Sequence, residues 1–144
     1  MSGERAASVS RPRWALIYDH ECGMCRVAAA LVLCADRRRS VTPVALQDAR
    51  ITELLAHVPR GRWAQSWHLA APDGRVYSGG AAIPELCRLL PGFGVPGLLC
   101  GAAPDVTERV YAGLAGNRRR IGARIPGRLV GWATGILDER SGRA

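Results

Sequence analysis

The stretch WALIYDHECGMCRVAAALVLCAD, residues 14–36, decides the fold of this sequence. Its first five residues are apolar and rich in β-formers, and the polar segment Asp19–Glu21 follows them. The last eleven residues are rich in alanine and leucine and are strongly helix-prone. The pattern therefore predicts a strand that ends at Tyr18, a polar break, and a helix that begins at the Cys-x-x-Cys pair of Cys22 and Cys25.

The position of the two cysteines favours thiol chemistry. The first turn of a helix carries unpaired backbone N–H groups and a partial positive charge, which stabilise a thiolate. Cys22 is expected at or before that turn, and Cys25 lies three residues further on the same side, near enough to close a small disulfide. One sulfur could then attack a disulfide and the other could resolve the mixed disulfide, as reversible exchange requires.

The motif Asp19-x-x-Cys22-x-x-Cys25 after a strand resembles the signature of the DCC family of thiol-disulfide oxidoreductases, which is named for these three residues. The similarity continues, more weakly towards the C-terminus, through residues 43–47 (PVALQ), 73–82 (DGRVYSGGAA), 109–111 (RVY) and 117–118 (NR). The resemblance implies a thioredoxin-like fold and an exchange activity carried by the two cysteines.

The two cysteines are expected to have different roles. Cys22 is the candidate attacking thiol, because the first cysteine of such a motif lies outermost at the start of the helix. Arg26, one turn further on, would add favourable charge. Cys25 is the candidate resolving thiol, more buried and with a higher pKa. The alternative is a chance Cys-x-x-Cys in a buried strand–helix junction.

Asp19 is the third candidate catalytic residue, and its role depends on which cysteine it approaches. Close to Cys22, its carboxylate would raise the pKa of the attacking thiol and oppose the reaction. Nearer Cys25, directly or through a water, it could take up the proton of the resolving thiol. A structural alternative is that Asp19 caps the loop or the helix, and both roles can hold together.

The order of the expected elements is β-α-β-α-β-β-α, which matches a thioredoxin-like α/β core with a four-stranded mixed sheet flanked by helices. Strands are expected at residues 15–18, 41–46, 67–70 and 75–77, and helices at 25–38, 51–57 and 82–90. The first two strands should be parallel, because a helix connects them. Pro43 indicates an edge strand or a bulge, and Asp48 is the expected cap of the second helix.

Three regions are predicted along the 144 residues: a disordered N-terminus (1–13), a thioredoxin-like domain (14–100) and a helical, arginine-rich C-terminal extension (101–144). Residues 91–101 are rich in glycine and proline and suggest a connector. Asp105–Glu108 resembles a capping box that opens a helix to about residue 115, with Val106, Val110 and Leu114 on one stripe. We assign no element to residues 121–137.

One segment departs from the thioredoxin pattern. Thioredoxins place a cis-proline just before the third strand, facing the active-site disulfide and shaping the substrate groove. The corresponding residues here are 64–67 (AQSW), and the nearest proline, Pro59, lies too far upstream. We therefore expect substrate docking to differ, with Trp63 and Trp67 as candidate flanks of the pocket or, alternatively, as core or interface residues.

The net charge of +8 comes from arginine alone, since the sequence has no lysine. Six arginines and no acid lie between residues 109 and 128. A basic segment of this kind can meet nucleic acid or an anionic membrane surface, although a solvated face is the interpretation that we favour. The same segment supports the alternative function of a non-enzymatic binding or adaptor module.

Cysteine usage favours a reducing, cytoplasmic setting. Five cysteines leave at least one unpaired, which does not suit a secreted disulfide scaffold. Residues 1–13 hold three arginines but no apolar core of a secretory signal. The longest apolar run, residues 27–35, is too short to span a bilayer.

A structural zinc site is the main rival interpretation of the motif. The further ligands on offer, none of them paired in a zinc-ligand spacing, are His20, Cys34, His57, His68, Cys87 and Cys100. Cys34 and Cys87 are instead expected to be small core residues on helices, and the role of Cys100 is left open.

The predicted function is therefore thiol-disulfide oxidoreductase, of the protein-disulfide reductase type, acting on the disulfides of proteins or small molecules. The dithiol of Cys22 and Cys25 carries the electrons, so no metal or organic cofactor is expected. The expected partners are a disulfide-containing substrate and an electron donor that the sequence does not identify.

Overall fold

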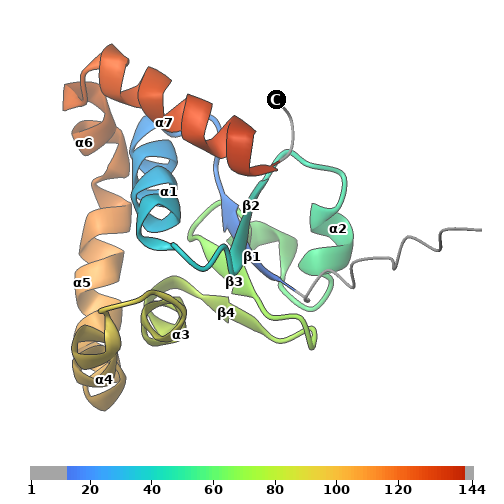
Figure 1. Cartoon of the computed structure of the whole chain (residues 1–144), viewed down its shortest axis with the longest axis vertical. Helices are drawn as coiled ribbons and strands as arrows, with labels where there is room; N and C mark the ends of the chain where they lie inside the picture. The colour runs from blue at the N-terminus through green and yellow to red at the C-terminus, as the bar shows by residue number, and fades with distance from the viewer. Residues whose placement is uncertain (1–12, 142–144) are drawn as a thin grey trace, which may run out of the picture.

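The computed structural model describes residues 13–141, and a four-stranded mixed sheet lies at its centre (Figure 1). The strands are β1 Trp14–Tyr18, β2 Val41–Ala45, β3 His68–Ala70 and β4 Val76–Ser78. Their order is β2-β1-β3-β4, with β1 parallel to β2 and the other two pairs antiparallel. The expected thioredoxin-like α/β fold is confirmed, and Pro43 lies on an edge strand as expected.

Seven helices and two short 3₁₀ turns surround this sheet in the described part of the chain. The helices are α1 Gly23–Ala35, α2 Ile51–Leu54, α3 Ala82–Leu89, α4 Gly94–Ala102, α5 Pro104–Gly116, α6 Arg118–Arg124 and α7 Gly127–Ser141. The 3₁₀ turns are η1 Arg60–Arg62 and η2 Gly79–Ala81. None of the helices within residues 13–141 has the length and apolar character needed to cross a bilayer.

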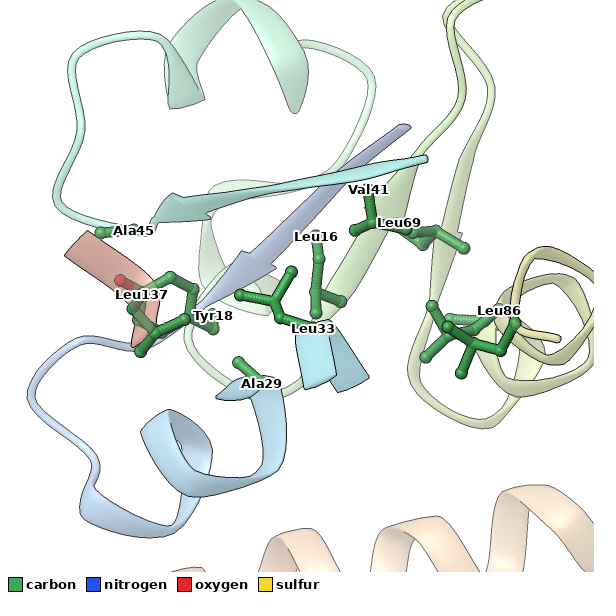
Figure 2. Packing of buried hydrophobic residues seen from close by; sticks show 11 residues of the cluster. Leu16, Tyr18, Ala29, Leu33, Val41, Ala45, Leu69, Leu86 and Leu137 are labelled. Atoms are coloured by element: carbon green, nitrogen blue, oxygen red, sulfur yellow. The ribbon is translucent and has the colours of Figure 1, made fainter. Parts of the chain in front are cut away.

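The two faces of the sheet bury separate apolar clusters, because side chains alternate along each strand. Leu16 and Tyr18 of β1 point to the face that α1, α3 and α7 cover, where Leu33 and Leu137 pack beside them (Figure 2). Ile17 points to the opposite face, which the segment around α2 covers. Strand β1, packed on both faces, thus fixes the direction in which the chain leaves the sheet at Asp19.

The C-terminal helix α7 packs along α1 and completes the first of these clusters (Figure 1). A buried ion pair closes the packing: Arg140 Nη2 lies 2.9 Å from Asp36 Oδ2. Arg140 also donates to the carbonyl oxygens of Leu33 and Val41, and so connects the end of α1 to the start of β2. Helix α1 is therefore covered on this side by α7, most of which lies in residues 121–137, where we assigned no element.

Helix α5 packs against η2 at a close backbone contact. A Cβ atom on Gly80 would lie 2.7 Å from the Cα of Glu108, so only glycine allows this approach. Gly79 before it has a φ of +61°, and the Gly80 N–H donates to Glu108 Oε2 over 2.8 Å. The contact holds α5 where its Tyr111 hydroxyl accepts the N–H of Trp67, the residue before β3.

Helix α1 ends at Ala35, three residues earlier than expected. The carboxylate of Asp36 accepts the N–H groups of Ser40 and Val41, at 3.0 and 2.9 Å, and turns the chain into β2. Residues 37–39, which we expected in the last helical turn, therefore lie in the loop that follows.

Neither of the two expected caps is formed. Asp48 lies two residues before Arg50, the N-cap of α2, and its side chain accepts the Arg50 N–H instead of capping the helix. The helix itself ends at Leu54 and does not run to residue 57. In α5 the N-cap is Ala103 without a side-chain cap, and Glu108 of the expected capping box bonds to Gly80. Tertiary contacts compete successfully for the carboxylate of Glu108.

The prediction of a connector at residues 91–101 is wrong, because most of this segment is helix α4. This helix lies against α3 at Gly97, where an added Cβ would be 2.8 Å from the Cβ of Cys87. It spans the predicted domain division at residue 100. The predicted disordered segment, residues 1–13, lies outside the described residues apart from Arg13.

Candidate functional site

The motif lies at the junction between β1 and α1, as the sequence predicted. Cys22 is the N-cap of α1, with extended backbone angles of φ −95° and ψ 114°. Its Sγ accepts the N–H of Cys25 over 3.3 Å, which is within range for a sulfur acceptor. Cys22 N donates to the carbonyl oxygen of Asp19 over 3.2 Å and fixes the turn before the helix. The Cys22 sulfur therefore accepts an N–H group of the first turn that has no partner within the helix, and it lies at the positive end of the helix dipole.

Cys25 differs from Cys22 in its surroundings. Burial, followed by the hydrogen bond and the negative charge of Cys22, raises the pKa of the Cys25 thiol to about 12. The charge of Arg118 acts in the opposite direction, and that of Asp19 adds a smaller upward contribution. At neutral pH, Cys25 is thus a thiol that must lose a proton before it can attack.

The carboxylate of Asp19 is held at the end of β1 by two donors. Its Oδ1 accepts the N–H of Glu21 and the Nε2 of Gln47, each at 3.0 Å. Gln47 also accepts the N–H of His20 through its Oε1, at 3.3 Å. The loops after β1 and β2 are therefore joined at the carboxylate, which closes a local turn and also acts electrostatically on Cys25.

A pocket with a volume of about 210 Å³ opens beside Asp19 and Cys25. Its lining is mostly apolar and includes Trp63 and Trp67, and within residues 13–141 Arg118 is its one cation. The segment 64–67, which replaces the cis-proline region of thioredoxins, is part of the lining, and no peptide bond within residues 13–141 is cis. The two tryptophans thus flank the pocket.

Tyr111 of α5 is a pocket residue that sequence reasoning missed. Its hydroxyl oxygen accepts the N–H of Trp67 over 2.9 Å, and the two rings stack with centroids 6.0 Å apart. Trp67 is held further by the bond from its Nε1 to the carbonyl oxygen of Gly79, at 3.2 Å. The weak similarity at residues 109–111 was the one signal in the sequence that pointed to this position.

Trp63 is fixed from the other side of the pocket. Its Nε1 donates to the carbonyl oxygen of Val58 over 2.9 Å, and the guanidinium of Arg60 lies 5.3 Å from the ring centroid. Its own carbonyl oxygen lies 3.2 Å from Nε2 of the buried His68. Burial lowers the pKa of His68, so a neutral imidazole supports this wall.

Arg26 extends from α1 towards the C-terminal helix. Its Nη1 donates to Thr134 Oγ1 of α7 over 3.2 Å. Its Nε is buried and has no hydrogen-bond partner within the described residues. Arg26 thus contributes to the α1–α7 interface. The favourable charge that it was expected to add near Cys22 stays a prediction.

The remaining cysteines lie apart from the pocket lining. Cys34 is exposed, so its expected core role is wrong: it lies on the same side of α1 as the exposed Leu31. Cys87 is buried between α3 and α4, as expected, and burial raises the pKa of its thiol. Within residues 13–141, no group of three or more His, Cys, Asp or Glu side chains is placed to hold a metal ion.

Of the six arginines between residues 109 and 128, five face solvent. Arg109, Arg119, Arg120, Arg124 and Arg128 are exposed, whereas Arg118 is half-buried at the pocket. Arg118 therefore differs from the other five in its burial. The binding of polyanions by those five stays a prediction.

Comparison with known proteins gives one match. A family model described as DCC1-like thiol-disulfide oxidoreductase matches residues 16–124, a range that holds Asp19, both cysteines, Tyr111 and Arg118. No curated protein and no solved structure matches the chain.

Proposed function

Because the chain belongs to the DCC1-like thiol-disulfide oxidoreductase family, we propose that its Cys22–Cys25 dithiol exchanges electrons with the disulfides of other molecules. Family membership indicates thiol-disulfide oxidoreductase activity in general. The observation that carries the assignment of residues is the N-cap position of Cys22, whose sulfur accepts the N–H of Cys25. The first cysteine thereby lies at the helix N-terminus, and the raised pKa of the second keeps it a thiol at neutral pH.

In the proposed direction, the protein reduces its substrate. The thiolate of Cys22 attacks one sulfur of the substrate disulfide, the S–S bond breaks, and the other sulfur leaves as a thiolate that takes up a proton. Cys25 then gives up its proton and attacks Sγ of Cys22, which releases the second substrate thiol. The substrate gains two electrons and two protons, and the protein is left with a Cys22–Cys25 disulfide that a thiol reductant must reduce again.

Asp19 is proposed as the acceptor of the proton that Cys25 loses. Its carboxylate lines the same pocket as Cys25 and acts on it electrostatically. The raised pKa of Cys25 makes this step the demanding one at neutral pH, because a base must remove the proton as the sulfur attacks. The hydrogen bonds from Glu21 and Gln47 keep the carboxylate in place.

The proposed setting is a reducing, cytoplasmic one. Five free thiols, among them the exposed Cys34, support it, because an exposed unpaired thiol is readily oxidised outside such a compartment.

Serine variants of the two cysteines test the proposal. Cys22→Ser should abolish exchange with a disulfide substrate, because nothing remains to attack. Cys25→Ser should accumulate a stable mixed disulfide on Cys22, seen as an added mass that a reductant removes. Cys34→Ser is the matched control, and it should exchange at the rate of the unchanged protein.

Two other outcomes would overturn parts of the proposal. If Cys25→Ser traps nothing while Cys22→Ser does, the two roles are reversed. If neither variant alters exchange, the cysteines carry no redox activity, and the binding or adaptor function becomes the better account.

A further inference from the structure

We propose that the pocket beside Cys25 binds a low-molecular-weight disulfide with an apolar chain and an anionic end, so that the protein acts on small molecules in preference to extended polypeptides. The inference rests on the function proposed above and concerns the substrate class of the same site. Three features of the pocket carry it: its cover, its size and lining, and the charge of Arg118.

The cover of the pocket includes Tyr111, which occupies a backbone donor that a polypeptide could otherwise use. The N–H of Trp67 lies just before β3, where an extended peptide could add its own hydrogen bonds. That N–H is already donated to the hydroxyl of Tyr111, which reaches it from α5. Helix α5 is in turn held against η2 by the close contact of Gly80 with Glu108, so Tyr111 is fixed in this position. The C-terminal segment thus removes one backbone hydrogen bond that a peptide docked before β3 could form.

The size and lining of the pocket suit a short apolar chain. An apolar cavity of about 150 Å³ holds a benzene molecule. The pocket here measures about 210 Å³ and is lined by Leu46, Ile83, Leu114 and the rings of the two tryptophans. It therefore accepts a ligand somewhat larger than benzene, and a folded polypeptide could insert no more than one side chain.

Arg118 supplies the charge at the pocket. It begins α6, is half-buried, and acts on Cys25 strongly enough to oppose part of the rise in the pKa of that thiol. No ion pair with a carboxylate is found for Arg118 within residues 13–141. A guanidinium in this position can pair with a carboxylate or a similar anionic group of the ligand.

The reaction follows from this placement. The sulfur of Cys22 accepts the N–H of the pocket residue Cys25, and in the proposed step its thiolate attacks a sulfur of the bound substrate, so that the substrate S–S bond breaks. The departing sulfur takes a proton, and attack by Cys25 then releases the substrate as a dithiol or as two thiols, with the two electrons now lost from the protein. A small thiol or dithiol reductant must return them.

A matched series of cyclic disulfides tests the inference on the full chain. Lipoate carries a dithiolane ring, an apolar chain and a carboxylate. Lipoamide lacks only the charge, and 1,2-dithiolane-3-carboxylate lacks only the chain. The second-order rate constant for oxidation of the reduced protein should be about ten-fold higher for lipoate than for either analogue. Insulin, a protein disulfide, should oxidise it more slowly than lipoate.

Variants at the pocket connect these preferences to the proposed residues. Arg118→Gln should bring the lipoate rate down to that of lipoamide, whereas Arg119→Gln removes the same charge from an exposed neighbour and should preserve the preference. Ala115→Phe, which fills the pocket, should slow lipoate about ten-fold more than the short dithiolane. If circular dichroism shows that Ala115→Phe is unfolded, Ala64→Phe at the exposed rim of the pocket replaces it in the same comparison.

The outcomes separate the inference from the function on which it rests. Equal rates for the three dithiolanes, or faster oxidation by insulin, would overturn the small-molecule class while exchange activity stands. If neither the dithiolanes nor insulin oxidises the Cys22–Cys25 pair, the proposed function itself fails.

Discussion

Cys22 and Cys25 are alike in the sequence, but the fold gives them different surroundings. Because burial, together with Cys22, raises the pKa of Cys25 to about 12, only a small fraction of this residue is thiolate at neutral pH. Burial favours the neutral form, so the titration moves to higher pH and never to lower pH. The difference between the two thiols is therefore a property that pH should reveal.

Alkylation of the folded protein with iodoacetamide measures this difference. The rate at Cys25 should rise about ten-fold per pH unit between about pH 7 and about pH 10, because the thiolate is the reactive species. Cys22, at the open end of the helix, should be modified first. Peptide mass spectrometry follows both sites, and a rate at Cys25 that is independent of pH would contradict the account.

Asp19→Asn separates the charge of this residue from its hydrogen bonds. Asparagine keeps an oxygen that can accept the N–H of Glu21, so the turn should survive. Resolution of the mixed disulfide should slow by about 10²-fold, as expected for the loss of a positioned base, while its formation changes little. Stopped-flow measurement of the two phases tests this, with Asp73→Asn in an exposed turn as the control. Equal slowing of both phases would indicate a capping role alone.

Single residues also show the limit of sequence reasoning. Cys34 and Cys87 both lie in apolar helical stretches, yet one is exposed and the other is buried. Their local patterns do not differ enough to predict this, since exposure depends on which side of each helix its neighbours cover. The motif residues were predictable because their chemistry depends on the adjacent strand end and helix start.

The glycines of η2 and α4 allow close packing between helices and turns. Gly97, Gly101 and Pro96 made residues 91–101 look like a connector in the sequence. In the fold, Gly97 instead lets α4 approach α3 at Cys87. A helix whose glycines serve packing cannot be told from a loop by composition, whereas β1 and α1 were predictable from propensity and order alone.

Gly80→Ala tests whether the contact between α5 and η2 positions Tyr111. The new Cβ would meet the backbone of Glu108, so α5 must move or strain must be accepted. We expect the free energy of unfolding to fall by about 1–3 kcal/mol. The fluorescence of the folded variant should also change, because Trp67 loses its partner Tyr111. Urea denaturation and emission spectra measure both.

Gly113→Ala in the same helix α5 is the matched control. Nothing lies within 4 Å of its added Cβ, so the variant should be neutral or more stable by up to about 1 kcal/mol. Equal behaviour of the two variants would contradict the packing role of Gly80.

Arg140 joins the C-terminal helix α7 to the end of α1. It pairs with Asp36, whose carboxylate is fully buried, and the side chain of Arg140 is only 12% exposed. Arg140→Met would leave that carboxylate without its cation, and the free energy of unfolding should fall by about 3 kcal/mol. Arg128→Met, an exposed arginine of the same α7, should change it by less than about 0.5 kcal/mol. Urea denaturation of both variants decides, and equal stabilities would refute the role of the pair.

The sequence predicted the β-α-β-α-β-β-α core but not the way in which its C-terminal segment covers it. Residues 121–137 carry glycine and proline among apolar residues, and their partners on α1 lie far away in the chain. Only the assembled core shows that Leu137 belongs to it. Tyr111 and Arg118 could not be predicted as pocket residues for the same reason: they lie on α5 and at the start of α6, far along the chain from Cys25.

The most direct test of the central claim is equilibration of the protein with glutathione buffers of graded potential, in a Cys34→Ser background that removes the exposed thiol. The account predicts one two-electron transition, in which the protein loses two hydrogen atoms and peptide mapping finds a Cys22–Cys25 disulfide. Its midpoint would also give the redox direction. If glutathione only forms mixed disulfides, and no Cys22–Cys25 bond appears at any potential, the claim that this pair carries the activity is contradicted.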